Sequence, residues 1–175
     1  GGVFIVLLYH FFSSKGAIDT NRVIKSVRSD KNIPFVMIPL IFISTVITHL
    51  LGGSAGREGA ALQLGGGIGY NIGKLLGFKK NEMRIIVMSG MSAVFAALFG
   101  TPLTAAIFAL EVTNVGVLHY MGLLPCVISA ITANEIAKMF GLHGVRFGGI
   151  EFGAVSWDNA LKVALLAVLC AAVIE

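Results

Sequence analysis

Long stretches without formal charge most strongly limit what this sequence can fold into. They are Ile33–Gly56, Ile85–Leu110 and Val112–Asn134, and a shorter one, Val163–Ile174, comes near the end. A helix that crosses a bilayer needs about 20 apolar residues, so the first three are long enough to span it. The mean hydropathy of +0.88, with only 13% charged residues, is far above that of soluble domains. The sequence therefore predicts an all-α, polytopic membrane protein whose surroundings are the lipid bilayer.

Glycine and proline residues divide the apolar stretches into helices. Gly52, Gly53 and Gly56 end a helix that begins near Pro34, because glycine tolerates the positive φ angles of a helix end. The Gly-Thr-Pro run at 100–102 breaks the longest stretch, and its proline suits the first turn of a new helix. Broken, tilted helices are therefore expected. Their ranges are residues 1–12, 20–29, 34–51, 58–76, 82–99, 102–114, 118–140 and 159–174.

These helices are expected to form a single partial transmembrane domain over residues 1–175. Both termini look truncated, because the first apolar run is short for a bilayer span and the last stops without a polar tail. The glycines at 65–67, 69 and 73 indicate close helix packing, since small residues let helix backbones approach each other in lipid.

Basic residues gather in two connections between the expected helices. Four lie within residues 22–31, and Lys74, Lys79, Lys80 and Arg84 form the second group. The positive-inside rule suits a cytoplasmic first connection, but the second is equally basic, so the sequence leaves the orientation open. A nucleic-acid partner is not predicted, because no soluble module with a basic face is present.

Arg57 and Glu58 place two charges between glycines in an otherwise uncharged region. An ion in hydrocarbon costs several kcal/mol, so such residues usually face a pathway or a partner. Because a helix ends before them and another starts at Glu58, the free amides of the new helix, aided by its dipole, form an anion site. We therefore expect Gly56, Arg57, Glu58, Gly59 and Ala60 to bind a small anion.

The carboxylate of Glu58 can compete with that anion for the same amides. Ionised, it can occupy and block the site; protonated or displaced by an anion, it can swing aside. This competition predicts a gate. Two simpler interpretations remain open: an ion pair between Arg57 and Glu58, or a carboxylate that only stabilises its own helix start.

Two motifs in this order carry a resemblance to a known family. Residues 56–69 read GREGAALQLGGGIG, and residues 99–103 (FGTPL) are followed by 107–112 (IFALEV). This pattern resembles the CLC family of chloride channels and proton-coupled anion transporters. The resemblance covers nearly the whole chain and implies half of an inverted-repeat CLC-type fold, with the second half absent.

The resemblance also implies roles and partners. Glu58 would be the external gating glutamate, and Arg57 would add positive potential at the entrance. The transported ion would be chloride, with protons as a second substrate if transport is coupled; fluoride or another anion exchanged for protons is the alternative. Family members are typically homodimers with a pore in each subunit, and a plasma membrane, such as the bacterial inner membrane, is the expected location.

Three positions depart from the family pattern. Ala60 replaces a proline, which leaves the helix start less rigidly preset. The nearest counterpart of the family's intracellular-side Gly-Ser-Gly-Ile-Pro loop contains Ser14, Gly16, Ala17 and Ile18. Val112 stands where proton-coupled members often have a second glutamate, which favours a channel.

Glu111, directly before Val112, is expected to be a supporting carboxylate at a helix end, with a direct role in transport as the alternative.

Other classes of function are less well supported. An intramembrane enzyme would pair Glu58 with His49, but no nucleophile motif accompanies them. A non-transporting scaffold fragment is a further alternative. The histidines lack metal-ligand spacing, and Cys126 and Cys170 sit alone in apolar runs, where small buried side chains are expected. We predict a transport protein and not an enzyme, with no cofactor and no metal.

Overall fold

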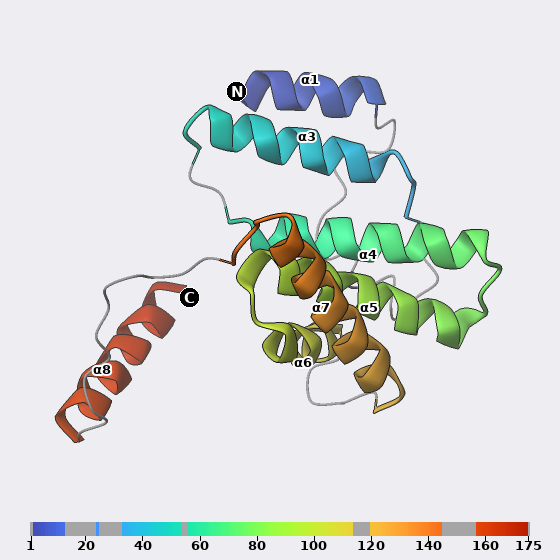
Figure 1. The fold of residues 1–175 in the computed structure, drawn as a ribbon. Helices are drawn as coiled ribbons and strands as arrows, with labels where there is room; N and C mark the ends of the chain where they lie inside the picture. Colours follow the sequence, from blue (N-terminus) through green and yellow to red (C-terminus); the bar gives the residue numbers. More distant parts are fainter. Residues whose placement is uncertain are drawn as a thin grey trace. The chain divides into compact units, whose positions relative to one another are not determined.

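The structure, a computed structural model, describes residues 2–12, 24, 33–53, 56–113, 120–144 and 157–174. Its regular structure is α-helical, with no strand in these ranges. The chain forms two compact units, Gly1–Val145 and Arg146–Glu175. Figure 1 shows the helices, which are α1 (Gly2–Phe12), α3 (Met37–Leu50), α4 (Glu58–Leu75), α5 (Lys80–Phe99), α6 (Pro102–Thr113), α7 (Tyr120–Met139) and α8 (Trp157–Ile174).

Two expectations fall largely or wholly outside the described residues. The helix expected at 20–29 is described only at Ile24, and the loop with Ser14, Gly16, Ala17 and Ile18 is not among the described ranges.

Helices α4 and α5 are antiparallel and pack backbone to backbone through glycines. The carbonyl oxygen of Gly90 occupies the place where a side chain on Gly65 would begin, and a Cβ on Gly69 would lie 2.5 Å from the carbonyl oxygen of Ile86. One turn further, a Cβ on Gly73 would lie 2.8 Å from Met83 Sδ. Residue numbers in these contacts increase along α4 and decrease along α5, so the two helices are antiparallel. The contacts also confirm the prediction that these glycines allow close packing.

Helix α3 packs against the opposite side of α4, also antiparallel. Asn71, near the end of α4, donates from Nδ2 to the carbonyl oxygens of Gly67 at 2.8 Å and Ile33 at 3.5 Å. Because Ile33 precedes the start of α3, that start lies beside the end of α4. Asn71 therefore joins the end of α4 to the segment directly before α3.

Helices α5, α6 and α7 enclose the most buried part of the core. Along α5 and α7, Met88 Cε would lie 2.9 Å from a Cβ on Gly122, Ser92 Oγ donates to the carbonyl of Cys126 at 3.0 Å, and Asn134 Oδ1 lies beside Gly100. These contacts advance together along both helices, so α7 runs parallel to α5. Helix α6 packs against both and runs antiparallel to α5. The rings of Phe95 on α5 and Phe108 on α6 are stacked, with 4.6 Å between their centroids. The largest fully buried side chains are Met88, Met91, Leu110, Val87, Thr113, Cys126 and Ser92.

The two cysteines differ in burial. Cys126 is buried, as predicted, but Cys170 is exposed on α8, so the prediction of burial was wrong there. The reason is that α8 is the helix of its own unit, and every side chain described on it, from 158 to 172, is exposed.

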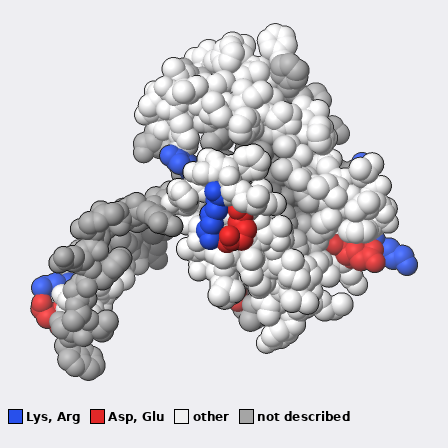
Figure 2. Space-filling model, viewed as in Figure 1, with Lys and Arg blue, Asp and Glu red and all other residues white. Residues whose placement is uncertain are grey.

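Among the described helices, α5 and α7 are long and apolar enough to cross a membrane, and α1, α3 and α6 are shorter apolar helices. The apolar stretch 33–56 was expected to be long enough to span, but α3 has only 14 residues, or about 21 Å. Large apolar side chains cover much of the surface. Figure 2 shows most of the face in view without charged side chains, and the few present lie in separate patches.

Candidate functional site

The helical structure is interrupted between α3 and α4, directly before Glu58. Helix α3 ends at Leu50, and Gly52 adopts a φ of 75°. The amides of Gly52 and Gly53 close the helix end by donating to the carbonyls of His49 at 3.1 Å and Thr48 at 2.8 Å. This hydrogen-bond pattern is a helix C-cap, so no continuous helix passes through Glu58.

The first turn of α4 presents backbone amides at its open end. The side chain of the N-cap residue, Arg57, makes no capping hydrogen bond. The first intrahelical bond joins the amide of Ala61 to the carbonyl of Arg57 at 2.9 Å. The amides of Glu58, Gly59 and Ala60 therefore precede the helical hydrogen-bond ladder, which is the arrangement that binds anions at helix starts.

The side chain of Glu58 turns back over Gly56. Its Oε2 atom occupies the place where a Cβ on residue 56 would sit, so glycine leaves the room that this carboxylate takes up. Both residues are exposed within the described part of the chain, as is Arg57. No ion pair joins Arg57 to Glu58 among the described residues. The carboxylate thus lies beside Gly56, the residue before the N-cap of α4.

The start of α6 lies toward the same end of the α4–α5 pair as the start of α4. Gly65 faces Gly90, so α4 begins about 10 Å before this contact and α5 ends at Phe99 about 14 Å beyond it. Gly100 then adopts a φ of 71°, and α6 begins at Pro102. The starts of α4 and α6 and the end of α5 therefore lie toward one end of the pair.

The family model described as voltage gated chloride channel matches residues 1–173. The chain belongs to this family.

Among curated relatives, a "Chloride/fluoride channel protein" of Pseudomonas syringae pv. tomato is 38% identical over 142 residues, which are 81% of this chain and 31% of that protein. An "H(+)/Cl(-) exchange transporter ClcA" of Vibrio parahaemolyticus is 32% identical over 150 residues, 81% of this chain and 30% of that protein. The chain thus spans about a third of the length of these relatives. Both are named as transport proteins, and the voltage gated chloride channel family consists of channels and exchangers, not enzymes.

Among solved structures, a CLC-type fluoride/proton antiporter matches with a TM-score of 0.82 and 32% identity. The match covers 96% of this chain and 42% of the antiporter chain. The described helices therefore form part of a CLC-type, all-α fold, and the chain is part of an integral membrane protein.

Glu111 lies far from the start of α4 along the helix direction. It is the tenth residue of α6, about 14 Å from Pro102, and α6 runs back along α5. Its side chain is half-buried and has an interaction partner within the protein. The structure therefore does not bring Glu111 together with Glu58, which favours the supporting role.

His49 does not form a catalytic pair with Glu58. Its Nε2 atom is buried in the last turn of α3 and has no hydrogen-bond partner in the part of the chain that is described. The acid/base pair of the enzyme hypothesis therefore lacks the contact on which it depends.

Asn134 lies near the helix break at Gly100, and the sequence analysis did not identify it. It is 5% exposed, lies on α7, and places Oδ1 4.0 Å from the position of a Cβ on Gly100. Its Nδ2 donates to Glu135 Oε1 at 3.2 Å, and Glu135 pairs with Lys138 at 2.7 Å. An asparagine inside an apolar helix was the available signal, because a buried amide needs polar partners.

Proposed function

We propose that the complete protein containing this chain passes small inorganic anions across a bilayer, and that the amides of Glu58, Gly59 and Ala60 bind the passing anion. One observation supports this proposal above the others. The break between two apolar helices leaves three first-turn amides outside the helical hydrogen bonds, and the nearby carboxylate of Glu58 turns back toward Gly56. In a bilayer, such a break is tolerated where it lines a cavity, because lipid cannot satisfy the backbone.

We also propose that Glu58 gates this site. An ionised carboxylate is attracted to the helix start for the same reason as a free anion, since both interact with the amides and the helix dipole. Protonation removes the charge and weakens that attraction. The position of the carboxylate over Gly56 supports a short movement between a blocking and an open position.

The proposed anion is chloride or fluoride. The motifs favour chloride, whereas the names of the Pseudomonas relative and of the structurally similar antiporter both include fluoride. Val112 favours passive flux, while the names of the Vibrio relative and of the antiporter indicate exchange for protons. Both questions are answered by one assay.

The assay is anion efflux from liposomes that contain the protein expressed from its complete gene. Chloride, fluoride and nitrate are compared, with and without a proton gradient. Passive flux dissipates an anion gradient alone, whereas exchange lets an imposed proton gradient drive the anion uphill.

The gate is tested with Glu58→Gln, which is expected to abolish the dependence of flux on external pH. Glu82→Gln is the matched control: Glu82 accepts a hydrogen bond from the amide of Lys79 at 2.8 Å, a role that glutamine can keep. Unchanged pH dependence in Glu58→Gln, or an equal loss in Glu82→Gln, would count against Glu58 as the gate.

We further propose a membrane orientation. Because α3 and α4 are antiparallel, the start of α3, which follows the basic residues of 22–31, and the connection from Lys74 to Arg84 lie at one end. The positive-inside rule then places this end in the cytoplasm, and the start of α4 toward the outside. In a Cys170→Ser background, Lys79→Cys should react with a membrane-impermeant maleimide in inside-out vesicles and not in intact cells; the reverse pattern would invert the orientation.

Residues 1–175 are proposed to be one part of a single transmembrane domain, in a protein that forms a homodimer in a plasma membrane. Both statements extend what the family membership supports. Mass photometry of the purified complete protein measures the dimer directly, and a monomeric mass would contradict it.

A further inference from the structure

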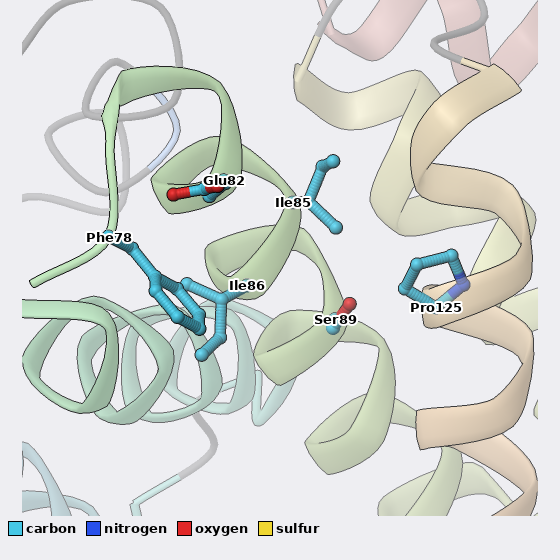
Figure 3. A pocket seen from close by; sticks show the side chains of 6 residues that line it. All are labelled: Phe78, Glu82, Ile85, Ile86, Ser89 and Pro125. Atoms are coloured by element: carbon cyan, nitrogen blue, oxygen red, sulfur yellow. The ribbon is translucent and has the colours of Figure 1, made fainter. Parts of the chain in front are cut away.

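Two grooves flank Ile85 near the start of α5. The first has a volume of about 360 Å³ and lies between α5 and α7. Figure 3 shows Pro125 of α7 across from Ile85 and Ser89, with Glu82, Phe78 and Ile86 farther from Pro125. The second has a volume of about 240 Å³ and lies between the start of α5 and the start of α7. Its lining consists of Asn81, Arg84, Ile85, Met88, Met121 and Gly122. Ile85 lines both grooves.

Polar and apolar groups are separated along this surface. Three polar lining residues, Asn81, Glu82 and Arg84, lie in the first five residues of α5, and the lining residues from Ile85 onward are apolar except for Ser89. Residues 74–84 contain four basic side chains and one acidic side chain, that of Glu82. Lys74, Lys79 and Lys80 are exposed. The surface therefore has a cationic rim above two largely apolar grooves.

This separation matches the order of chemical groups in a membrane leaflet. Helix α5 is long and apolar enough to span, so its charged start lies at the level of the lipid headgroups and its apolar residues lie at the level of the acyl chains. Basic pockets between spanning helices on the cytoplasmic side are known binding places for anionic headgroups. An anionic headgroup, unlike a zwitterionic one, complements the excess of basic over acidic side chains in residues 74–84.

We propose that this surface, formed by the two grooves beside Ile85 and the basic rim of Lys79, Lys80 and Arg84, binds an anionic phospholipid of the cytoplasmic leaflet. The phosphate group lies at the rim, and the two acyl chains lie in the grooves on either side of Ile85. The leaflet follows from the membrane orientation proposed above, but binding does not depend on anion transport.

The direct test is native mass spectrometry of the complete protein, titrated with phosphatidylglycerol or with phosphatidylcholine of the same acyl chains. Phosphatidylglycerol is expected to bind more tightly. Each basic residue near a membrane surface contributes enough for about a fivefold change in affinity, so Lys80→Gln combined with Arg84→Gln should weaken phosphatidylglycerol binding about 30-fold. Phosphatidylcholine binding should change little.

Two control variants separate charge from folding. Lys80→Arg combined with Arg84→Lys keeps both charges and should keep the preference. Lys138→Gln removes one charge from the last turn of α7, toward the other end of the parallel helices, and should bind phosphatidylglycerol as the wild type does. Equal affinity for the two lipids, an unaffected double glutamine variant, or an equal loss in Lys138→Gln would overturn the proposal.

A photoreactive phosphatidylglycerol with a diazirine on its acyl chain locates the occupant of the grooves. Labelling is expected on peptides that contain residues 85–89 and 121–125. Absence of label there means that another segment of the complete protein or a second copy covers the grooves, and the proposal is then wrong. Glu58→Gln should retain the lipid preference, so a failure of the proposed anion gate and a failure of lipid binding are distinguished.

Discussion

Replacing Gly65 by alanine should force α4 and α5 apart. An added Cβ would overlap the carbonyl oxygen of Gly90 and lie 2.8 Å from its carbonyl carbon and 2.9 Å from the Cα of Met91. All three atoms belong to the backbone of α5, so no rotation of a side chain relieves the overlap. The helices must separate locally by about 1 Å to restore ordinary contacts, and a gap of that size forfeits up to half of the dispersion energy of the atoms that line it.

The magnitude follows from two opposing terms. Overpacking in a well-packed core costs about 1–3 kcal/mol, while alanine stabilises a helix over glycine by about 0.5–1 kcal/mol. Because the overlap is with backbone atoms, the upper part of the overpacking range applies, about 2–3 kcal/mol, and the net loss of stability is therefore about 1–2.5 kcal/mol. Because α4 carries Glu58 at its start, the same displacement should also lower anion flux.

Gly67→Ala is the matched control on the same buried helix. Its Cβ would meet side-chain atoms, Ile38 Cγ1 at 3.2 Å and Ile33 Cγ2 at 3.8 Å, which can shift by a few tenths of an ångström. Thermal unfolding of the detergent-solubilised complete protein compares the two variants with the wild type. A Gly65→Ala variant as stable as the wild type, or a larger loss in Gly67→Ala, would refute the argument from backbone contact.

Three further changes test the helix breaks and the core. Gly56→Ala should displace the flexible Glu58 carboxylate that lies against it, leaving thermal stability nearly unchanged but raising anion flux at neutral pH; flux equal to wild type contradicts the gate geometry. Gly100→Ala places a side chain at a φ of 71°, so unfolding should show a loss of about 1–2 kcal/mol, and unchanged stability argues against this backbone. Ser92→Ala removes the donor to the buried carbonyl of Cys126 and should cost about 1–3 kcal/mol in the same assay; no loss means that this hydrogen bond contributes nothing.

Helix ends could be predicted from the sequence where the backbone preference of a single glycine or proline sets them. The break at Gly100 and the start of α6 at Pro102 depend on one left-handed residue and one preset φ angle, and both lie where the sequence predicts them. The start of α5 differs. It begins at Lys80 and not at residue 82, because Glu82 caps the amide of Lys79 and stabilises an earlier first turn.

The burial of side chains and the packing partners of helices were harder to predict from the sequence, because they depend on neighbours from other helices. Glycine content predicted close packing of α4, but the sequence could not say that its partner is α5 or that Gly65 meets Gly90. Cys126 and Cys170 both lie in apolar runs, yet Cys126 is buried and Cys170 is exposed, and the difference could not be predicted from their own helices.

The sequence by itself determined that the chain is helical and embedded in a membrane, that a helix starts at Glu58, and which family the motifs resemble. These features follow from hydropathy and from the conformations that individual residues allow. Tertiary structure decided that the start of α3 lies at the same end as the basic connection from Lys74 to Arg84, that the Glu58 carboxylate turns over Gly56, and that Glu111 is kept away from it. The physical reason is that helix direction and register are set by contacts between residues far apart in the chain, to which no local pattern refers.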